Sequence, residues 1–210
     1  MGGTKGAGGK SGSGANCGRQ SKPGRYIRTR TRGSGWLWGG LGAVVVAGIV
    51  LLTVRGTRLP AGTQTFPEPN HQHVTGNVQY DRTPPAGGAH SAVWLNCGIY
   101  DQPVPNPNAV HSMEHGAVWV TYQPSLPQAE VSALRGLVRS KYRDAQRYVI
   151  LSPYPGDPAP IVVSAWGAQL RVQSPSDPHL AQFIGHFAGG DQGGEPGGPC
   201  TGGTGTPLDS

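Results

Sequence analysis

The chain has 210 residues, enough for one ordinary domain with extensions, and only 13% of them are charged. Its formal charge of +6 is unevenly distributed: residues 1–35 carry eight Lys and Arg and no acid, whereas residues 36–210 carry nine Lys and Arg against eleven acids. The positive charge therefore belongs to one N-terminal tail, and the balance of −2 in the rest of the chain argues against a nucleic-acid-binding role.

Residues 1–35 are rich in Gly and Ser, which predicts a disordered basic tail. Residues 36–54 contain no charge, and at ~1.5 Å per residue a helix of this length spans roughly 28 Å, about the core of a bilayer. The positive charges before this segment predict a single-pass transmembrane helix with a cytoplasmic N-terminus. A cleaved signal peptide is the rival interpretation, but its apolar region is normally about 7–15 residues long. We expect residues 55–69 to form a linker.

Residues 70–188 are expected to form the folded domain, which begins with a lobe of loops. The segment from about His71 to Asn108 is dense in Pro, Gly and Asn, which favour turns over helices and strands. Regular structure is predicted only after His115. The predicted elements are a strand at 117–123, a helix capped by Ser125, strands at 147–154, 161–167 and 169–173, and a helix that begins at Asp177-Pro178.

This order predicts an α+β domain with a mostly antiparallel sheet and two helices, preceded by the Pro/Gly-rich lobe and by one N-terminal transmembrane helix. Residues 189–210 form a Gly-rich tail. Cys97 and Cys200 both lie on the predicted extracytoplasmic side, where a disulfide can persist. Two thiols can also bind a metal, but we favour a disulfide because Cys200 lies in a tail that has little else to hold it.

The segment from His111 to His115 contains the densest group of potential metal ligands. If it is extended, His111, Met113 and His115 share one face and present two imidazoles and a thioether, a set that suits copper. If it is a helical turn, His111, Glu114 and His115 share a face instead. Their order, H-x-x-E-H, is typical of one group of zinc proteases.

Three functions remain open for these side chains. They could bind copper or zinc; the histidines could instead hydrogen-bond loop backbone in a non-catalytic envelope interaction or assembly module; or the motif could belong to a zinc-dependent hydrolase. The hydrolase is disfavoured because Pro107 and Gly116 leave little room for a protease helix, and because Glu195 lies in the tail. His71 and His73 are interpreted as a flexible segment that could contribute a labile ligand.

Several stretches together resemble the bacterial family called domain of unknown function 3105 (DUF3105), over about residues 70–200. They are PPAGGAH (84–90), WLNCGIYDQPV (94–104), VHSMEHGAVWVTY (110–122), LSPYPG (151–156) and SAWG (164–167). The resemblance implies a membrane-anchored bacterial protein with an extracytoplasmic domain, and it implies no established activity.

The resemblance also directs attention to individual residues. His90, His111, Glu114 and His115 occupy positions of the family motifs PP-x-GG-x-H and H-S-x-E-H-G. Met113 stands where the family commonly has Leu, which weakens the copper–thioether interpretation. The resemblance of residues 198–200 to members with a Cys in the same place favours a Cys97–Cys200 bridge.

We therefore expect His90, His111 and His115, with Glu114 or Met113, to form a copper or zinc site. Its expected role is binding, delivery or sensing rather than catalysis. The expected location is the cell membrane, with the C-terminal domain outside the cytoplasm. The membrane and an unidentified envelope protein are the expected partners, without nucleic acid.

Overall fold

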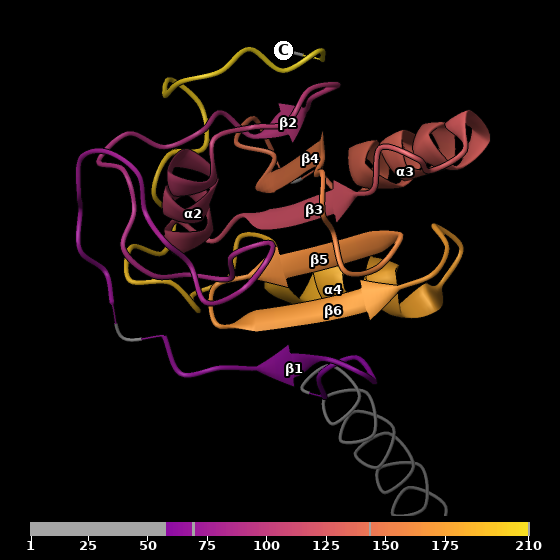
Figure 1. Cartoon of the computed structure of the whole chain (residues 1–210), viewed down its shortest axis with the longest axis horizontal. Coiled ribbons are helices and arrows are strands. Elements are labelled where there is room, and N and C mark those ends of the chain that lie inside the picture. Colours follow the sequence, from indigo (N-terminus) through magenta and orange to yellow (C-terminus); the bar gives the residue numbers. More distant parts are fainter. Residues whose placement is uncertain (1–57, 69, 143, 210) are drawn as a thin grey trace, which may run out of the picture. The chain divides into compact units, whose positions relative to one another are not determined.

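The computed structural model describes residues 58–68, 70–142 and 144–209, which contain one six-stranded sheet and three helices (Figure 1). None of the helices in these ranges is long and apolar enough to cross a membrane. The predicted transmembrane helix at 36–54, like the basic tail before it, lies outside the described residues.

The sheet is mixed, so the prediction of a mostly antiparallel sheet is wrong. Its strand order is β1-β6-β5-β3-β4-β2, and β4 is parallel to both of its neighbours, β3 and β2, whereas the other pairs are antiparallel. The β3–β4 pair is parallel because a helix connects these two strands, and such a crossover returns the chain in the same direction. The strands are β1 Gln64–Thr65, β2 Gly98–Ile99, β3 Val118–Tyr122, β4 Val149–Pro153, β5 Ile161–Ala165 and β6 Ala168–Val172.

The described residues form three helices where two were predicted: α2 Asn106–Glu114, α3 Gln128–Ser140 and α4 Pro178–Phe187. Helix α2 was missed because it begins inside the Pro- and Asn-rich stretch; its Pro107 lies in the first turn, where a helix tolerates proline. Helix α4 begins as predicted, with the Asp177 side chain accepting a hydrogen bond from the His179 backbone N–H. Helix α3 has no side-chain cap, so Ser125 does not play the predicted role.

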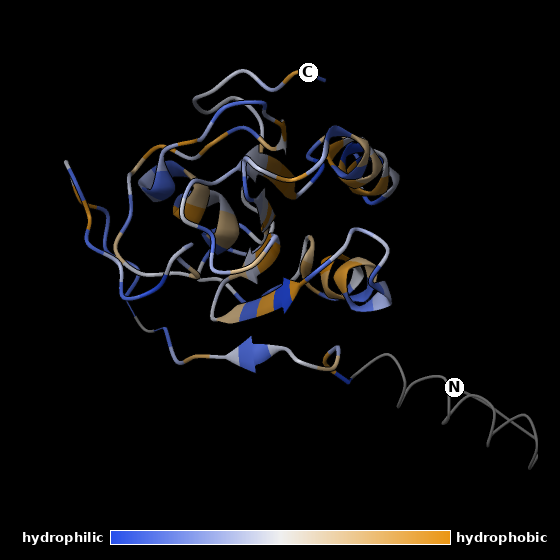
Figure 2. Cartoon of the chain, turned by 45° about the vertical axis from the view of Figure 1, so that its right-hand side comes forward, coloured by the Kyte–Doolittle hydropathy of each residue, from blue (hydrophilic) through white to orange (hydrophobic). Residues whose placement is uncertain are grey.

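Alternate residues of the four central strands separate two faces of the sheet. The register aligns an apolar row across all four, from Val120 of β3 to Leu151 of β4, Val163 of β5 and Leu170 of β6. Figure 2 shows this alternation as stripes along β6. Apolar side chains of α3 and α4 belong to the same core cluster as these strand residues, and these two helices contact β4, β5 and β6. They are Val131, Leu134, Val138, Leu180, Phe183, Ile184 and Phe187.

The opposite row of the sheet is more polar and contacts the lobe. Gln169 Nε2 donates to Pro84 O at 3.1 Å, and Gly167 N–H donates to Ala86 O at 2.7 Å. The predicted disulfide is confirmed between Cys97 and Cys200, whose Cα atoms are 5.3 Å apart. It fastens the Gly-rich tail to the lobe and so returns the C-terminal segment to the neighbourhood of α2.

Candidate metal centre

The last turn of α2 directs three ionisable side chains to one place. His111 and Glu114 lie on the helix, and His115 is its C-cap; all three are at most 3% exposed. Gly116 ends the helix with φ of +101°, and a Cβ there would lie 2.6 Å from Gly190 O. Because His111 and Glu114 lie on the helix and His115 caps it, a helical turn rather than an extended segment sets the geometry of the H-x-x-E-H motif.

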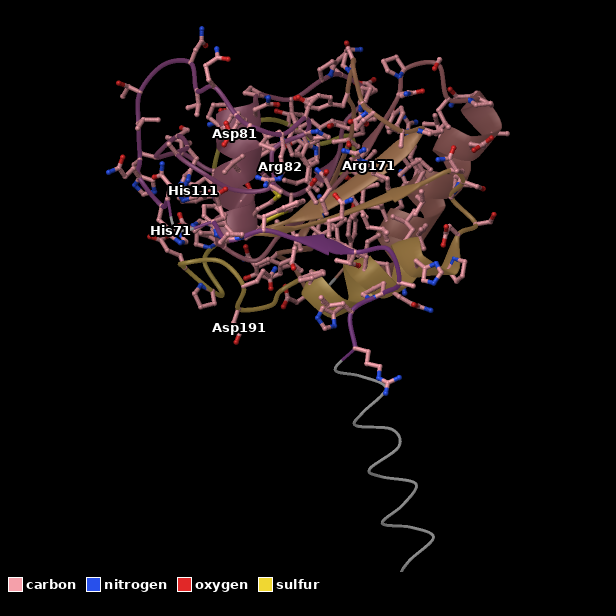
Figure 3. The ribbon with its side chains drawn as sticks, turned by 60° about the horizontal axis from the view of Figure 1, so that its bottom comes forward. His71, Asp81, Arg82, His111, Arg171 and Asp191 are labelled. Carbon is pink, nitrogen blue, oxygen red and sulfur yellow. A yellow bond between two sulfur atoms is a disulfide. The ribbon has the colours of Figure 1, made fainter. Side chains whose placement is uncertain are left out.

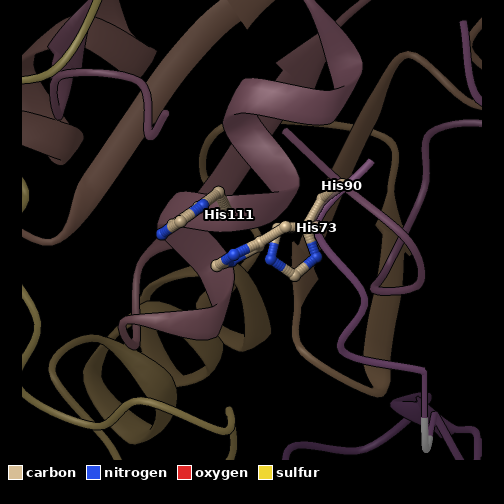
Figure 4. Close-up of side chains that lie close together, drawn as sticks. All are labelled: His73, His90 and His111. Carbon is tan, nitrogen blue, oxygen red and sulfur yellow. The ribbon is translucent and has the colours of Figure 1, made fainter. Parts of the chain in front are cut away.

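The lobe adds His90 and His73 to this group. These two residues form an isolated parallel bridge, in which Val74 N–H donates to His90 O at 2.7 Å and His90 N–H donates to Gln72 O at 3.0 Å. Their rings lie 5.0 Å and 4.9 Å from the His111 ring, centroid to centroid. Figure 4 shows the three rings grouped beside the helix.

The Gly-rich tail supplies a second carboxylate. Glu195 N–H donates to Glu114 O and Gly197 N–H donates to His115 O, both at 3.3 Å, so the tail follows the end of α2. Glu195 Oε2 lies 3.3 Å from His115 Nε2. Gly193 has no room for a side chain, since a Cβ there would overlap the carbonyl oxygen of Glu114.

Backbone carbonyls fix the tautomer of the three buried imidazoles. The Nδ1 of His90, His111 and His115 lies 2.8, 2.6 and 2.6 Å from the carbonyl oxygens of Gly88, Ser91 and Pro199, respectively. A carbonyl can only accept, so each Nδ1 carries a proton and donates it. In the neutral rings the Nε2 atoms therefore carry lone pairs, the state in which histidine binds a metal.

These lone pairs face other acceptors. His111 Nε2 lies 2.9 Å from His115 Nε2, and His90 Nε2 lies 2.8 Å from Glu114 Oε2. The His90–Glu114 contact lacks hydrogen-bond geometry, so both atoms are buried without a hydrogen-bond partner. Burial lowers the pKa of His111, and the neighbouring His115, His90 and His73 lower it further, against the effect of its bond to Ser91 O. His111 is therefore held neutral and ready to act as a ligand.

Two tryptophans and two exposed side chains surround the buried group. Trp166 stacks on His71 with 4.6 Å between ring centroids, and the Trp94 ring centroid lies 5.4 Å from that of His115. His71 Nδ1 donates to Glu114 Oε1 at 2.5 Å. His73 and Glu195 are 42% and 54% exposed, so solvent reaches the centre through them. Figure 3 shows His71 and His111 at one end of the domain, away from Arg171.

The structure brings four of the five predicted metal ligands together: His90, His111, Glu114 and His115. It places the fifth, Met113, elsewhere, fully buried in the hydrophobic core. Among the described residues, three groups have ligand atoms within 4.8 Å of one another. They are His73/His90/His111, His111/His115/Glu195 and His73/Glu114/Glu195.

The sequence interpretation undervalued His73 and set Glu195 aside because it lies in the tail. One signal could have identified Glu195: it is five residues before Cys200, so the disulfide that anchors the tail also limits how far this carboxylate can move. For His73 the signal is weaker, because the backbone pairing with His90 joins segments 17 residues apart and follows no local pattern.

Comparison with known proteins identifies the family and nothing closer. A family model described as "Protein of unknown function (DUF3105)" matches residues 71–202, which include every residue of the centre described above. Searches of curated proteins and of solved structures found no match. The match spans more than half of the chain, and the chain therefore belongs to the DUF3105 family.

Proposed function

We propose that this domain binds a transition-metal ion, zinc or copper, through the cluster of histidines and carboxylates at the end of α2. The observation that carries the proposal is the pairing of buried acceptors. His90 Nε2 faces Glu114 Oε2, neither of which has a hydrogen-bond partner, and in the neutral rings the lone pair of His111 Nε2 faces that of His115 Nε2. A buried acceptor without a donor costs about 1–3 kcal/mol, and a cation between two acceptors converts that cost into two coordinate bonds.

The distances suit a shared ion after a small movement. Two nitrogens bound to one tetrahedral zinc at ~2.1 Å each are roughly 3.4 Å apart, compared with 2.9 Å between the Nε2 atoms of His111 and His115. The carbonyls that hold the Nδ1 atoms are the outer ligand shell that metal-binding histidines usually have. The shell is therefore present, and the metal ligands need to separate by about half an ångström.

The chemistry of the ligands favours a borderline ion. Imidazole and carboxylate suit divalent zinc and copper, whereas the soft thioether that would favour Cu(I) is absent from the cluster because Met113 packs in the core. Exposed His73 also lines a cavity of about 580 Å³ with Val93 and Pro107. An ion at the centre can therefore exchange with solvent, as binding, delivery or sensing requires.

The two other functions have less support. Purely structural histidines would direct both ring nitrogens to donors or acceptors that match them, and the Nε2 of His90 does not. A hydrolase of the H-x-x-E-H type uses the glutamate as a base beside a water molecule. Glu114 is 2% exposed and its carboxylate contacts His71 and His90, so it acts as a ligand or an ion-pair partner.

The test is the affinity of the metal-free, oxidised chain for Zn²⁺ and for Cu²⁺, measured in competition with a chelator. We expect stoichiometric binding of at least one of these ions, and loss of at least tenfold in affinity in His111→Ala/His115→Ala. His186→Ala is the matched control, because His186 is exposed on α4 and lies outside the cluster. Far-UV circular dichroism checks that the variants fold. Equal affinities in parent and double variant would refute the proposal.

We propose in addition that the domain works in an oxidising compartment outside the cytoplasm, since the Cys97–Cys200 disulfide holds the tail that supplies Glu195. Peptide mapping after thiol alkylation of intact cells tests this. Both cysteines should resist alkylation until a reductant is added; immediate alkylation of Cys97 and Cys200 would contradict it.

A further inference from the structure

We infer that the cluster is built for two metal ions held side by side, an inference that rests on the proposed metal-binding function. The buried acceptor atoms form two separate pairs rather than one ring of ligands. One pair is His90 Nε2 and Glu114 Oε2, at 2.8 Å; the other is His111 Nε2 and His115 Nε2, at 2.9 Å.

Each pair has a third ligand nearby on the solvent side, although His73 also lies within 4.8 Å of His111, and Glu195 within 4.8 Å of Glu114. His73 Nε2 lies 3.9 Å from Glu114 Oε2, and Glu195 Oε2 lies 3.3 Å from His115 Nε2. Each position therefore has two imidazoles and one carboxylate. The lobe position consists of His73, His90 and Glu114, and the tail position of His111, His115 and Glu195.

A single ion leaves some of the ligand atoms of the cluster without a partner. Zinc takes four ligands in a closed site, and the cluster offers six ligand residues. An ion at the tail position alone leaves the lone pairs of His90 and Glu114 facing one another without a hydrogen-bond partner. An ion at the lobe position alone leaves His111 Nε2 facing His115 Nε2. Two ions satisfy both pairs.

The two positions are close neighbours. The rings of His90 and His111, one from each position, lie 5.0 Å apart between centroids, and carboxylate oxygens of Glu114 and Glu195 are within 4.8 Å of each other. This crowding is compatible with the ~3.5–4 Å between the ions of two-metal sites. Three protein ligands per ion also leave an open position on each, where water or a small anionic ligand can bind.

The experiment counts the ions and assigns them. The metal-free, full-length chain is dialysed to equilibrium against Zn²⁺, and bound zinc per chain is measured by mass spectrometry of the element. We expect two ions in the parent and one in each of His73→Ala and Glu195→Gln. Both substituted side chains are exposed, so the variants should fold. His186→Ala, outside the cluster, should retain two ions.

Loading with Co²⁺ gives an independent readout, because two neighbouring ions couple magnetically. The parent should show a coupled electron paramagnetic resonance spectrum, and each variant the spectrum of an isolated ion. One zinc per chain in the parent, weakened by both substitutions, would overturn the two-ion inference and leave metal binding intact. Retention of neither Zn²⁺ nor Cu²⁺ would overturn both.

Discussion

Two regions of the domain are held together by different means. The sheet region, residues 117–187, has an apolar core whose buried side chains repeat every second residue on strands and every third or fourth on α3 and α4. The lobe region, residues 70–116 with the tail 189–209, has few regular elements and relies on single hydrogen bonds, glycine contacts and one disulfide. The candidate metal centre lies in the lobe region.

This contrast teaches that stability and binding depend on different residues. In the sheet region stability depends on many apolar contacts, so a substitution there lowers stability without displacing the metal ligands. In the lobe region a single contact often positions a ligand, as Pro199 O does for His115. Substitutions there should affect metal affinity as strongly as stability, and the following predictions test this difference.

Removal of the disulfide should have the largest effect. In Cys97→Ser/Cys200→Ser a 103-residue loop is no longer closed, which costs up to about 4–5 kcal/mol of unfolding free energy in the chain-entropy model. Metal affinity should fall as well, because the tail that carries Glu195 is released. Urea denaturation and zinc competition measure the two quantities. Unchanged zinc affinity in the folded variant would break the proposed link between tail and centre.

Truncation of a core residue should lower stability alone. Phe183 of α4 is fully buried, so Phe183→Ala should lower the unfolding free energy by about 3–5 kcal/mol. Zinc affinity per folded molecule should stay within about twofold of the parent, whereas Phe183→Leu should retain most of the stability. A large loss of affinity in folded Phe183→Ala would show that the two regions are coupled more tightly than we expect.

A methyl group on Gly193 should have a smaller effect on stability and a clear effect on binding. Its Cβ would overlap the carbonyl oxygen of Glu114, so the tail must shift, at a cost of about 1–3 kcal/mol. We expect zinc affinity to decrease roughly tenfold. Gly136→Ala on α3 is the matched control, since nothing lies within 4 Å of a Cβ there and alanine favours a helix by about 1 kcal/mol.

The last comparison concerns two pH dependences of opposite sign, one from each region. Burial lowers the pKa of His111 in the lobe region, so the unfolded chain binds the proton first and stability falls as pH decreases below about 6.5. In the sheet region, burial raises the pKa of Asp157 from 3.8 to about 7. The folded chain then holds the proton, and stability falls as pH rises from about 4 through 7.

The variants His111→Gln and Asp157→Asn separate these contributions. Between pH 5 and 6.5 the two contributions oppose each other in the metal-free parent. Over this interval the urea midpoint should therefore fall more steeply with rising pH in His111→Gln than in the parent, and should rise with pH relative to the parent in Asp157→Asn. Each group contributes at most about 1.4 kcal/mol per pH unit. Identical pH profiles for the parent and both variants would contradict the assignment of these pH dependences to His111 and Asp157.

Much of the sheet region was predictable because its signals are local. Strands β3, β4 and β5 lie within the predicted segments, β6 begins one residue before its own, and the Asp177 cap begins α4 as expected. The parallel direction of β4 was not predictable from its own residues, since strand direction depends on how the crossover helix packs. Helix α2 was missed because Pro107 was interpreted as a sign of irregular structure, although the first helical turn tolerates it.

For the centre, the sequence by itself determined that His111, Glu114 and His115 lie within five positions and would share a face if the segment were helical. It also indicated the bridge between Cys97 and Cys200. Only the tertiary structure decided that Met113 faces the core and that His73 and Glu195 join the ligands. The physical reason is that these contacts join segments 17 to 122 residues apart, where loop closure and packing, rather than local spacing, determine which side chains meet.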